Sequence, residues 1–146
     1  MMALLVGLKS LKEVGIIHRD IKPNNFLYNP KTRSGVIIDF GLAEIDPDHE
    51  SILRAERNRL LAAKENTREV DFKLNMYKQL GQVQNEVGKN KIGTEAYMPL
   101  ESMLHVPKQG YESDIWPVGV ILLQFALRKF NIFHHIRYNP RIDIKN

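Results

Sequence analysis

The chain has 146 residues, of which 43% are hydrophobic and 26% are charged, and its formal net charge is +4. This length and composition predict one globular domain with a core of its own. The absence of cysteine excludes disulfide bonds and thiolate metal sites, as is typical of intracellular proteins. The longest apolar run, residues 118–123, is far shorter than the roughly 20 residues that cross a bilayer. No basic segment precedes the apolar N-terminus, so we expect neither a signal peptide nor a membrane segment.

The excess of positive charge lies in residues 54–91. This segment holds nine Lys or Arg residues and five acids, and the difference equals the net charge of the whole chain. A basic segment can contact nucleic acid or acidic protein. Because both signs are interspersed here and aromatic residues are few, we expect a solvated helix and no direct contact with nucleic acid.

The first predicted element is a helix over residues 1–14. Its apolar side chains recur at helical spacing and form one stripe: Met1, Leu4, Leu5, Leu8 and Leu11. Gly15 follows where a left-handed residue commonly ends a helix. A short apolar segment, residues 16–17, then leads into a polar stretch.

A β-hairpin is predicted after that polar stretch. Residues 26–28 and residues 36–38 are apolar and strand-like, and the residues between them, 29–35, have the composition of a turn. Such a hairpin presents Asn25 and Asp39 on the same side, although fourteen residues separate them.

Two short polar motifs flank this hairpin. Residues 18–25 read His-Arg-Asp-Ile-Lys-Pro-Asn-Asn, and residues 39–41 read Asp-Phe-Gly. Ordinary loop residues around a turn are the alternative interpretation. They would not be expected to match five specified residues in a window of eight and then Asp-Phe-Gly after an apolar strand. The two motifs resemble the H-R-D-x-K-x-x-N and D-F-G signatures of eukaryotic protein kinases.

The chemistry of phosphoryl transfer gives four of these residues a role. Asp20 can orient an acceptor hydroxyl and accept its proton, and Lys22 can place a positive charge near the transferring phosphate. Asn25 and Asp39 offer the oxygen ligands that magnesium prefers. We therefore predict Asp20, Lys22 and Asn25 as catalytic residues. The predicted ATP contacts are Lys22, Asn25 and Asp39, and the predicted Mg²⁺ ligands are Asn25 and Asp39.

The resemblance implies structural or regulatory roles for four neighbours. His18 is expected to pack and hydrogen-bond within the loop rather than act as a base. Arg19 is expected to pair with a phosphate on the activation segment. Phe40 and Gly41 complete the D-F-G motif.

Residues 93–101, Gly-Thr-Glu-Ala-Tyr-Met-Pro-Leu-Glu, resemble the G-T-x-x-Y/F-x-A-P-E block that closes a kinase activation segment. The resemblance implies that Thr94 hydrogen-bonds the Asp20–Lys22 pair, a feature of serine/threonine-specific members. Pro-Leu-Glu replaces Ala-Pro-Glu. Glu101 is retained, and we expect it to be unpaired or to have lost its usual arginine partner.

Residues 113–120 resemble the family pattern D-x-W-S-x-G, with Pro117 in place of the serine. The resemblance implies that Asp114 holds the backbone of the catalytic loop. The helix that begins here and runs to about Leu127 is apolar on nearly all sides, so we expect a buried central helix. Ser113 is a candidate helix cap, and Pro117 is expected within or just past the first turn.

Residues 46–92 are predicted to form an insertion, because the closing block follows Asp-Phe-Gly much later than in typical kinases. Asp46 and Pro47 suit the start of a helix, and Glu50 with Arg54 makes a favourable pair four residues apart. Residues 75–91 are polar and contain glycine, which indicates loop or disorder.

We therefore expect a mainly helical α+β fold, a partial protein-kinase C-lobe spanning residues 1–146 with the N-lobe absent. No G-x-G-x-x-G occurs in the sequence. Residues 25–29, the insertion, the Thr94 block and the D-x-W pattern together are most similar to the cell-division-cycle-seven (Dbf-dependent) kinases, which residues 128–135 also resemble. The alternative is the casein kinase 1 group, which resembles the catalytic loop but lacks the D-x-W pattern.

The resemblance implies a serine/threonine kinase that uses ATP and Mg²⁺, acts on protein substrates and works in cell-cycle or replication control in the nucleus. An activating regulatory subunit is a further implied partner. The alternatives are a catalytically inactive, kinase-like binding fragment and an incomplete gene product. The adjacent His134 and His135 have no third metal ligand nearby, so we expect a solvated pair.

Overall fold

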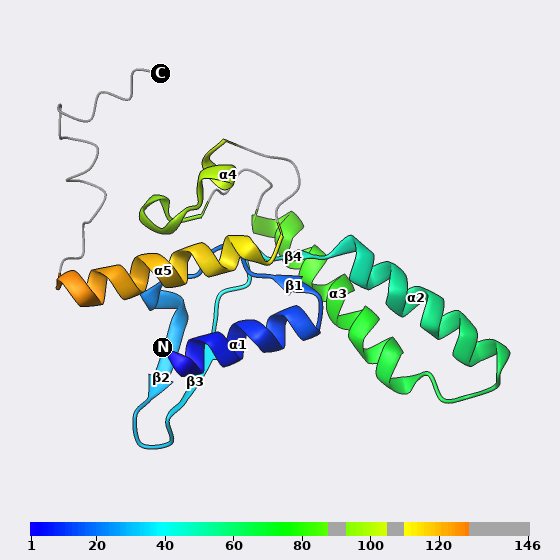
Figure 1. Ribbon diagram of the computed structural model, residues 1–146. Helices are drawn as coiled ribbons and strands as arrows, with labels where there is room; N and C mark the ends of the chain where they lie inside the picture. Colours follow the sequence, from blue (N-terminus) through cyan, green and yellow to red (C-terminus); the bar gives the residue numbers. More distant parts are fainter. Residues whose placement is uncertain (88–92, 105–109, 129–146) are drawn as a thin grey trace.

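The computed structural model describes residues 1–87, 93–104 and 110–128. The predicted stretch 88–91, residues 129–135 and the His134–His135 pair lie outside these ranges. The described residues form a mainly helical α+β fold (Figure 1). Its elements, in chain order, are α1 (Met2–Glu13), β1 (Ile16–Ile17), η1 (Pro23–Asn25), β2 (Phe26–Asn29), β3 (Ser34–Ile37), β4 (Glu44–Ile45), α2 (Pro47–Ala62), α3 (Arg68–Val87), η2 (Glu95–Tyr97), α4 (Leu100–Met103) and α5 (Glu112–Leu127).

Helix α1 agrees in part with the predicted stripe. Leu4 and Leu8 are buried and pack with Ile37 of β3, and Leu11 is partly buried against them, whereas Met1 and Leu5 are exposed. The helix ends before Gly15, whose φ of +74° is the left-handed conformation expected there. An added Cβ at Gly15 would lie 2.5 Å from the imidazole of His49, so this position has room only for glycine.

The predicted hairpin is formed by β2 and β3, which pair antiparallel from Phe26 with Ile37 to Asn29 with Ser34. Strand β3 begins two residues earlier than predicted because Ser34 and Gly35 also pair with β2. A second, two-stranded sheet pairs β1 with β4, which joins Ile16 to Ile45. This second pairing was not predicted.

Helices α2 and α3 lie side by side as a helical hairpin that projects away from the two sheets (Figure 1). The predicted start of α2 is confirmed: the Asp46 side chain accepts a hydrogen bond from the Asp48 N–H at 3.0 Å, and Pro47 occupies the first turn. Glu50 and Arg54 form the predicted pair at 2.6 Å.

The prediction of loop or disorder over residues 75–91 is wrong for 75–87, which belong to α3. Leu74, Tyr77 and Leu80 recur every three residues and pack onto a cluster that contains Ile16 and Ala43. This spacing places them on one face of a helix, so tertiary packing stabilises a segment that its polar composition disfavours.

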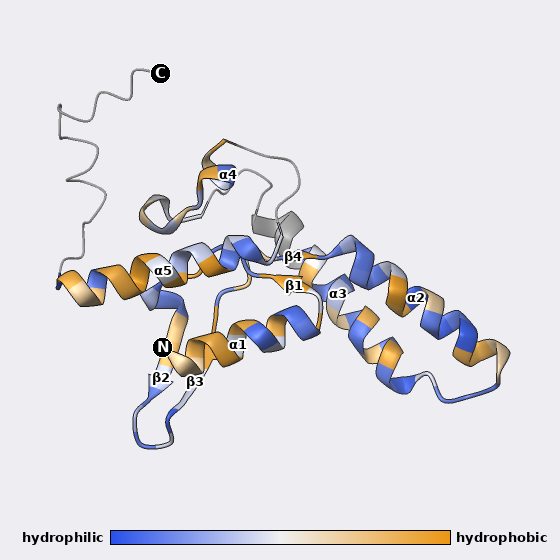
Figure 2. Ribbon diagram, in the orientation of Figure 1, coloured by the Kyte–Doolittle hydropathy of each residue, from blue (hydrophilic) through white to orange (hydrophobic). Residues whose placement is uncertain are grey.

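Helix α5 supplies the other side of the main core, which contains Leu4, Leu8, Ile21, Ile37, Val118 and Ile121. The prediction that α5 is buried on nearly all sides is wrong for the described residues. The C-terminal part of α5 is largely hydrophobic (Figure 2). One side of the helix is exposed, and its large hydrophobic residues are Ile115, Trp116, Leu122, Leu123, Phe125 and Leu127. The described elements pack against α5 on its opposite side only. None of the described helices combines the length and hydropathy needed to cross a bilayer.

Candidate active site

The loop between β1 and η1 carries the first motif, and Asp114 of α5 holds its backbone. The Asp114 carboxylate accepts hydrogen bonds from the N–H groups of His18 at 2.7 Å and Arg19 at 2.8 Å. Arg19 has a φ of +68°, a conformation that costs a non-glycine residue free energy. Burial raises the pKa of the Asp114 carboxyl, and the two N–H donors oppose that rise. Asp114 thus fixes a strained turn directly before Asp20.

His18 is fully buried and connects the first motif to the second. Its Nδ1 accepts a hydrogen bond from the Asp20 N–H at 3.2 Å, so the ring proton lies on Nε2. Nε2 then donates to the Ile38 carbonyl at 2.9 Å, and the edge of the ring packs against Phe40 with centroids 5.0 Å apart. Both ring nitrogens of His18 are thus occupied, so the imidazole has no free site for proton transfer.

Asp20, Lys22 and Thr94 form one polar cluster, although Thr94 lies more than seventy residues along the chain. Lys22 Nζ donates to Thr94 Oγ1 at 2.7 Å and lies 3.3 Å from Asp20 Oδ2. Thr94 donates to Asp20 Oδ1 from its hydroxyl at 3.1 Å and from its N–H at 3.2 Å. The hydrogen bonds predicted for Thr94 are therefore present, and the carboxylate of Asp20 is held on both oxygens.

Asn25 is oriented by the same carboxylate. Its Nδ2 donates to the Asp20 carbonyl at 2.8 Å and to Asp20 Oδ2 at 3.2 Å. The amide oxygen of Asn25 therefore points away from Asp20. The Asn25 carbonyl accepts from the Ile38 N–H at 2.9 Å, which ties Asn25 to the residue before Asp39.

Asp39 has a φ of +63° and an exposed side chain, whose Oδ1 accepts a hydrogen bond from the Gly41 N–H at 3.2 Å. Among the described residues, no group of three or more His, Cys, Asp or Glu is arranged to hold a metal ion. An amide oxygen and one carboxylate still fit Mg²⁺, which commonly takes one or two protein ligands and completes its shell with water and phosphate oxygens. The donor set therefore suits Mg²⁺ bound together with a phosphorylated ligand.

Arg19 has a partner that the sequence did not reveal. Its Nη1 lies 2.5 Å from Oε1 of Glu44 in β4, whereas the prediction gave Arg19 a phosphate partner. Its Nε is buried without a hydrogen-bond partner among the described residues. The pairing of β1 with β4 brings Glu44 next to the loop, and no local sequence signal marks a strand of two residues.

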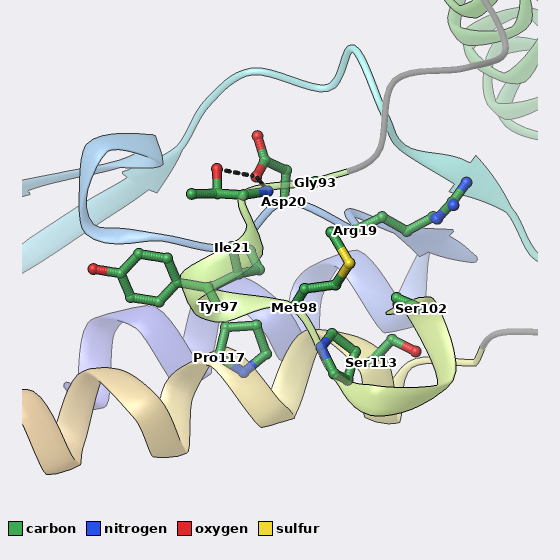
Figure 3. A pocket seen from close by; sticks show the side chains of 11 residues that line it. Arg19, Asp20, Ile21, Gly93, Tyr97, Met98, Ser102, Ser113 and Pro117 are labelled. Atoms are coloured by element: carbon green, nitrogen blue, oxygen red, sulfur yellow. Dashed lines mark hydrogen bonds between the residues drawn. The ribbon is translucent and has the colours of Figure 1, made fainter. Parts of the chain in front are cut away.

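The block of residues 93–101 packs against the loop. An added Cβ at Gly93 would lie 2.8 Å from the Arg19 carbonyl oxygen, so the glycine permits a close backbone approach. Among the described residues, Glu101 forms no ion pair with an arginine, and its Oε1 accepts a hydrogen bond from the Ser113 hydroxyl at 3.2 Å. Ser113 therefore does not cap α5, which begins one residue earlier at Glu112. Pro117 lies in the second turn of α5 and lines a small pocket with Asp20, Gly93 and Met98 (Figure 3).

Comparison with known proteins identifies the family. The protein kinase domain family matches residues 1–144. The chain is 34% identical over 137 residues to the cell cycle serine/threonine-protein kinase hsk1 of Schizosaccharomyces pombe, covering 90% of this chain and 26% of that protein. It is 33% identical over 138 residues to the cell cycle protein kinase spo4 of the same yeast, covering 89% of this chain and 32% of that protein.

A shorter match has a higher sequence identity. The chain is 51% identical over 41 residues to the cell division cycle 7-related protein kinase of Mus musculus, covering 28% of this chain and 7% of that protein. The chain spans between a quarter and a third of the length of the two yeast relatives. It therefore belongs to the protein kinase domain family, in which it is similar to the Cdc7 and Hsk1 group of cell-cycle serine/threonine kinases.

Proposed function

We propose that this protein is a serine/threonine protein kinase that transfers the γ-phosphoryl group of ATP to hydroxyl groups of protein substrates. The observation that carries the proposal is the cluster in which Lys22, Thr94 and Asn25 all contact the carboxylate of Asp20. These contacts hold both carboxylate oxygens in one orientation. A general base must lie within hydrogen-bond reach of the proton that it takes, so a fixed carboxylate suits this role.

Each residue of the site has a separate role in the proposed reaction. Asp20 orients the acceptor hydroxyl and takes its proton as the oxygen bonds to the γ-phosphorus and the bond to the departing ADP breaks. Lys22 stabilises negative charge on the transferring group, and it is held in place by Thr94. Asn25 and Asp39 would hold Mg²⁺, which when bound neutralises charge on the phosphate oxygens.

The lobe assignment and the role of α2 and α3 belong to the same proposal. The described residues correspond to a C-terminal lobe, and residues 46–92 to an insertion in the activation segment. The names of the yeast relatives support a role in the cell cycle. Control of DNA replication in the nucleus and an activating subunit stay predictions from that similarity.

Phosphotransfer by the natural full-length protein tests the proposal. We expect Mg²⁺-dependent transfer of label from ATP to a protein substrate on serine or threonine. Removing a group that stabilises transition-state charge typically costs about 100-fold to 1000-fold in rate, so Asp39→Ala should abolish nearly all transfer. The control is Asp48→Ala, which removes an exposed carboxylate from α2 and should keep the wild-type rate.

The outcome also separates the proposal from its alternative. Transfer that survives Asp39→Ala unchanged would overturn the assigned chemistry. A wild-type protein that transfers no phosphate to any substrate, but still binds partner proteins, would instead support a non-catalytic kinase-like binding protein.

A further inference from the structure

The α2–α3 helical hairpin and the residues that lead into it contact three consecutive residues shortly before the catalytic loop. The Tyr77 hydroxyl of α3 donates to the Val14 carbonyl. The Asp46 N–H, at the start of α2, donates to the Gly15 carbonyl at 2.8 Å. Ile16 of β1 then pairs with β4, which leads into α2. These contacts hold the chain only two residues before His18.

Tyr77 lies at the centre of this junction. Its side chain is 3% exposed and packs in one cluster with Ile16 and Ala43. Its oxygen also lies 2.8 Å from Nδ1 of His49 in α2. Because a carbonyl can only accept, the single hydroxyl proton goes to Val14, and His49 Nδ1–H donates to the Tyr77 oxygen.

Two further observations show how closely this junction is packed and hydrogen-bonded. Burial, with the nearby charges of Glu50 and Asp46, raises the pKa of Tyr77, so the hydroxyl stays protonated and keeps its donor at neutral pH. The imidazole of His49 fills the space beside Gly15, where even a Cβ would not fit. Helix α2 therefore packs directly against the glycine that ends α1.

Strand β1 has only two residues, too few to fix the direction of the following loop by pairing alone. Asp114 holds the loop at His18 and Arg19, from the side of α5. The contacts of the hairpin and of the residues that lead into it hold the chain a few residues earlier, at residues 14–16. The backbone that leads to Asp20 is thus held at two places, one of which depends on Tyr77 of the α2–α3 hairpin and on the residues that lead into α2.

We propose that Tyr77 is a positioning residue for the catalytic loop, and that the α2–α3 hairpin acts through the Tyr77–Val14 contact as an internal support for Asp20. This inference rests on the proposed function, since it assigns the support to the phosphotransfer site. Tyr77 would not touch substrate or nucleotide. Its effect would reach Asp20 only through the backbone of β1 and the loop.

Tyr77→Phe in the natural full-length protein tests the inference, because it removes only the hydroxyl. We expect kcat to fall about threefold to tenfold, the range that one hydrogen bond can supply, while KM for ATP stays within about twofold. We also expect amide hydrogen exchange to rise in residues 14–21 and to stay unchanged in α5. The matched control is Tyr28→Phe, which removes a hydroxyl from a half-exposed tyrosine in β2 and should change neither measurement.

The two readouts distinguish the possible failures. An unchanged kcat, or exchange that rises equally in α5, would overturn the positioning role, because the second result is a general loss of stability. A wild-type protein without phosphotransfer, whose Tyr77→Phe variant still shows faster exchange only in residues 14–21, would overturn the proposed function and support the structural hold of Tyr77 on the loop.

Discussion

Substitution of Asp114 should lower the free energy of unfolding more than substitution of an exposed acidic residue on the same helix. Asp114→Ala leaves the buried N–H of His18 and the partly buried N–H of Arg19 without their acceptor. A buried donor without a partner costs about 1–3 kcal/mol, so two such donors cost about 2–6 kcal/mol in the free energy of unfolding. Domains of this kind have only about 5–15 kcal/mol in total.

Asp114→Asn separates the contribution of the hydrogen bonds to stability from that of the buried charge. Its amide keeps one oxygen acceptor but turns an N–H₂ group toward the second donor, so about half of the hydrogen-bond loss remains, about 1–3 kcal/mol. Relief of charge burial offsets part of this loss, since burial raises the pKa of Asp114. We therefore expect Asn to destabilise less than Ala.

Urea unfolding followed by the fluorescence of Trp116, the single tryptophan, measures both changes. The control is Glu112→Gln, an exposed acidic residue in the first turn of the same helix, which should cost less than about 1 kcal/mol. A loss below about 1 kcal/mol for Asp114→Ala, or a larger loss for Asn than for Ala, would refute the reasoning from unsatisfied donors.

Two further predictions concern the hairpin and its junction. Gly15→Ala should lower the free energy of unfolding by at least about 1–2 kcal/mol because of its positive φ and the contact with His49, whereas Gly81→Ala in α3, with open space around it, should raise it by about 0.5–1 kcal/mol. Urea unfolding that shows no difference between the two variants would contradict this. Hydrogen bonds from Arg57 and Thr67 hold the pKa of Asp71 below its ordinary value of 3.8. The ionised Asp71 carboxylate therefore stabilises the fold above pH 3.8, and this stabilisation is lost as the pH falls through the folded-state pKa. The difference in melting temperature between wild type and Asp71→Asn should therefore shrink on acidification, and a constant difference would argue against the pairing.

The parts of the site that short motifs carry were predictable from sequence. Asp20, Lys22 and Asn25 lie within one loop, and spacing alone brings them together. The contacts of Thr94 with Asp20 and of Asp114 with His18 join residues 74 and 96 positions apart, and they were predicted because both residues lie in recognisable family motifs. Composition and periodicity alone would not have placed either contact.

Features that depend on long-range packing were missed. Strand β4 exists only through its pairing with β1, so Glu44 gave no signal as the partner of Arg19. Residues 75–87 are polar on average, and their helix depends on a few apolar residues such as Tyr77 that pack on a distant strand. The apolar composition of α5 predicted burial on all sides, but the described elements cover only one side.

The central claim is that Asp20 accepts the proton of a substrate hydroxyl. Asp20→Asn in the natural full-length protein tests it most directly, because the amide keeps the shape of the side chain but loses the base. General-base catalysis contributes about 100-fold to 10,000-fold, so we predict that kcat for phosphotransfer falls by at least about 100-fold while KM for ATP changes little. A variant that retains kcat within about threefold of wild type, with KM unchanged, would contradict the account.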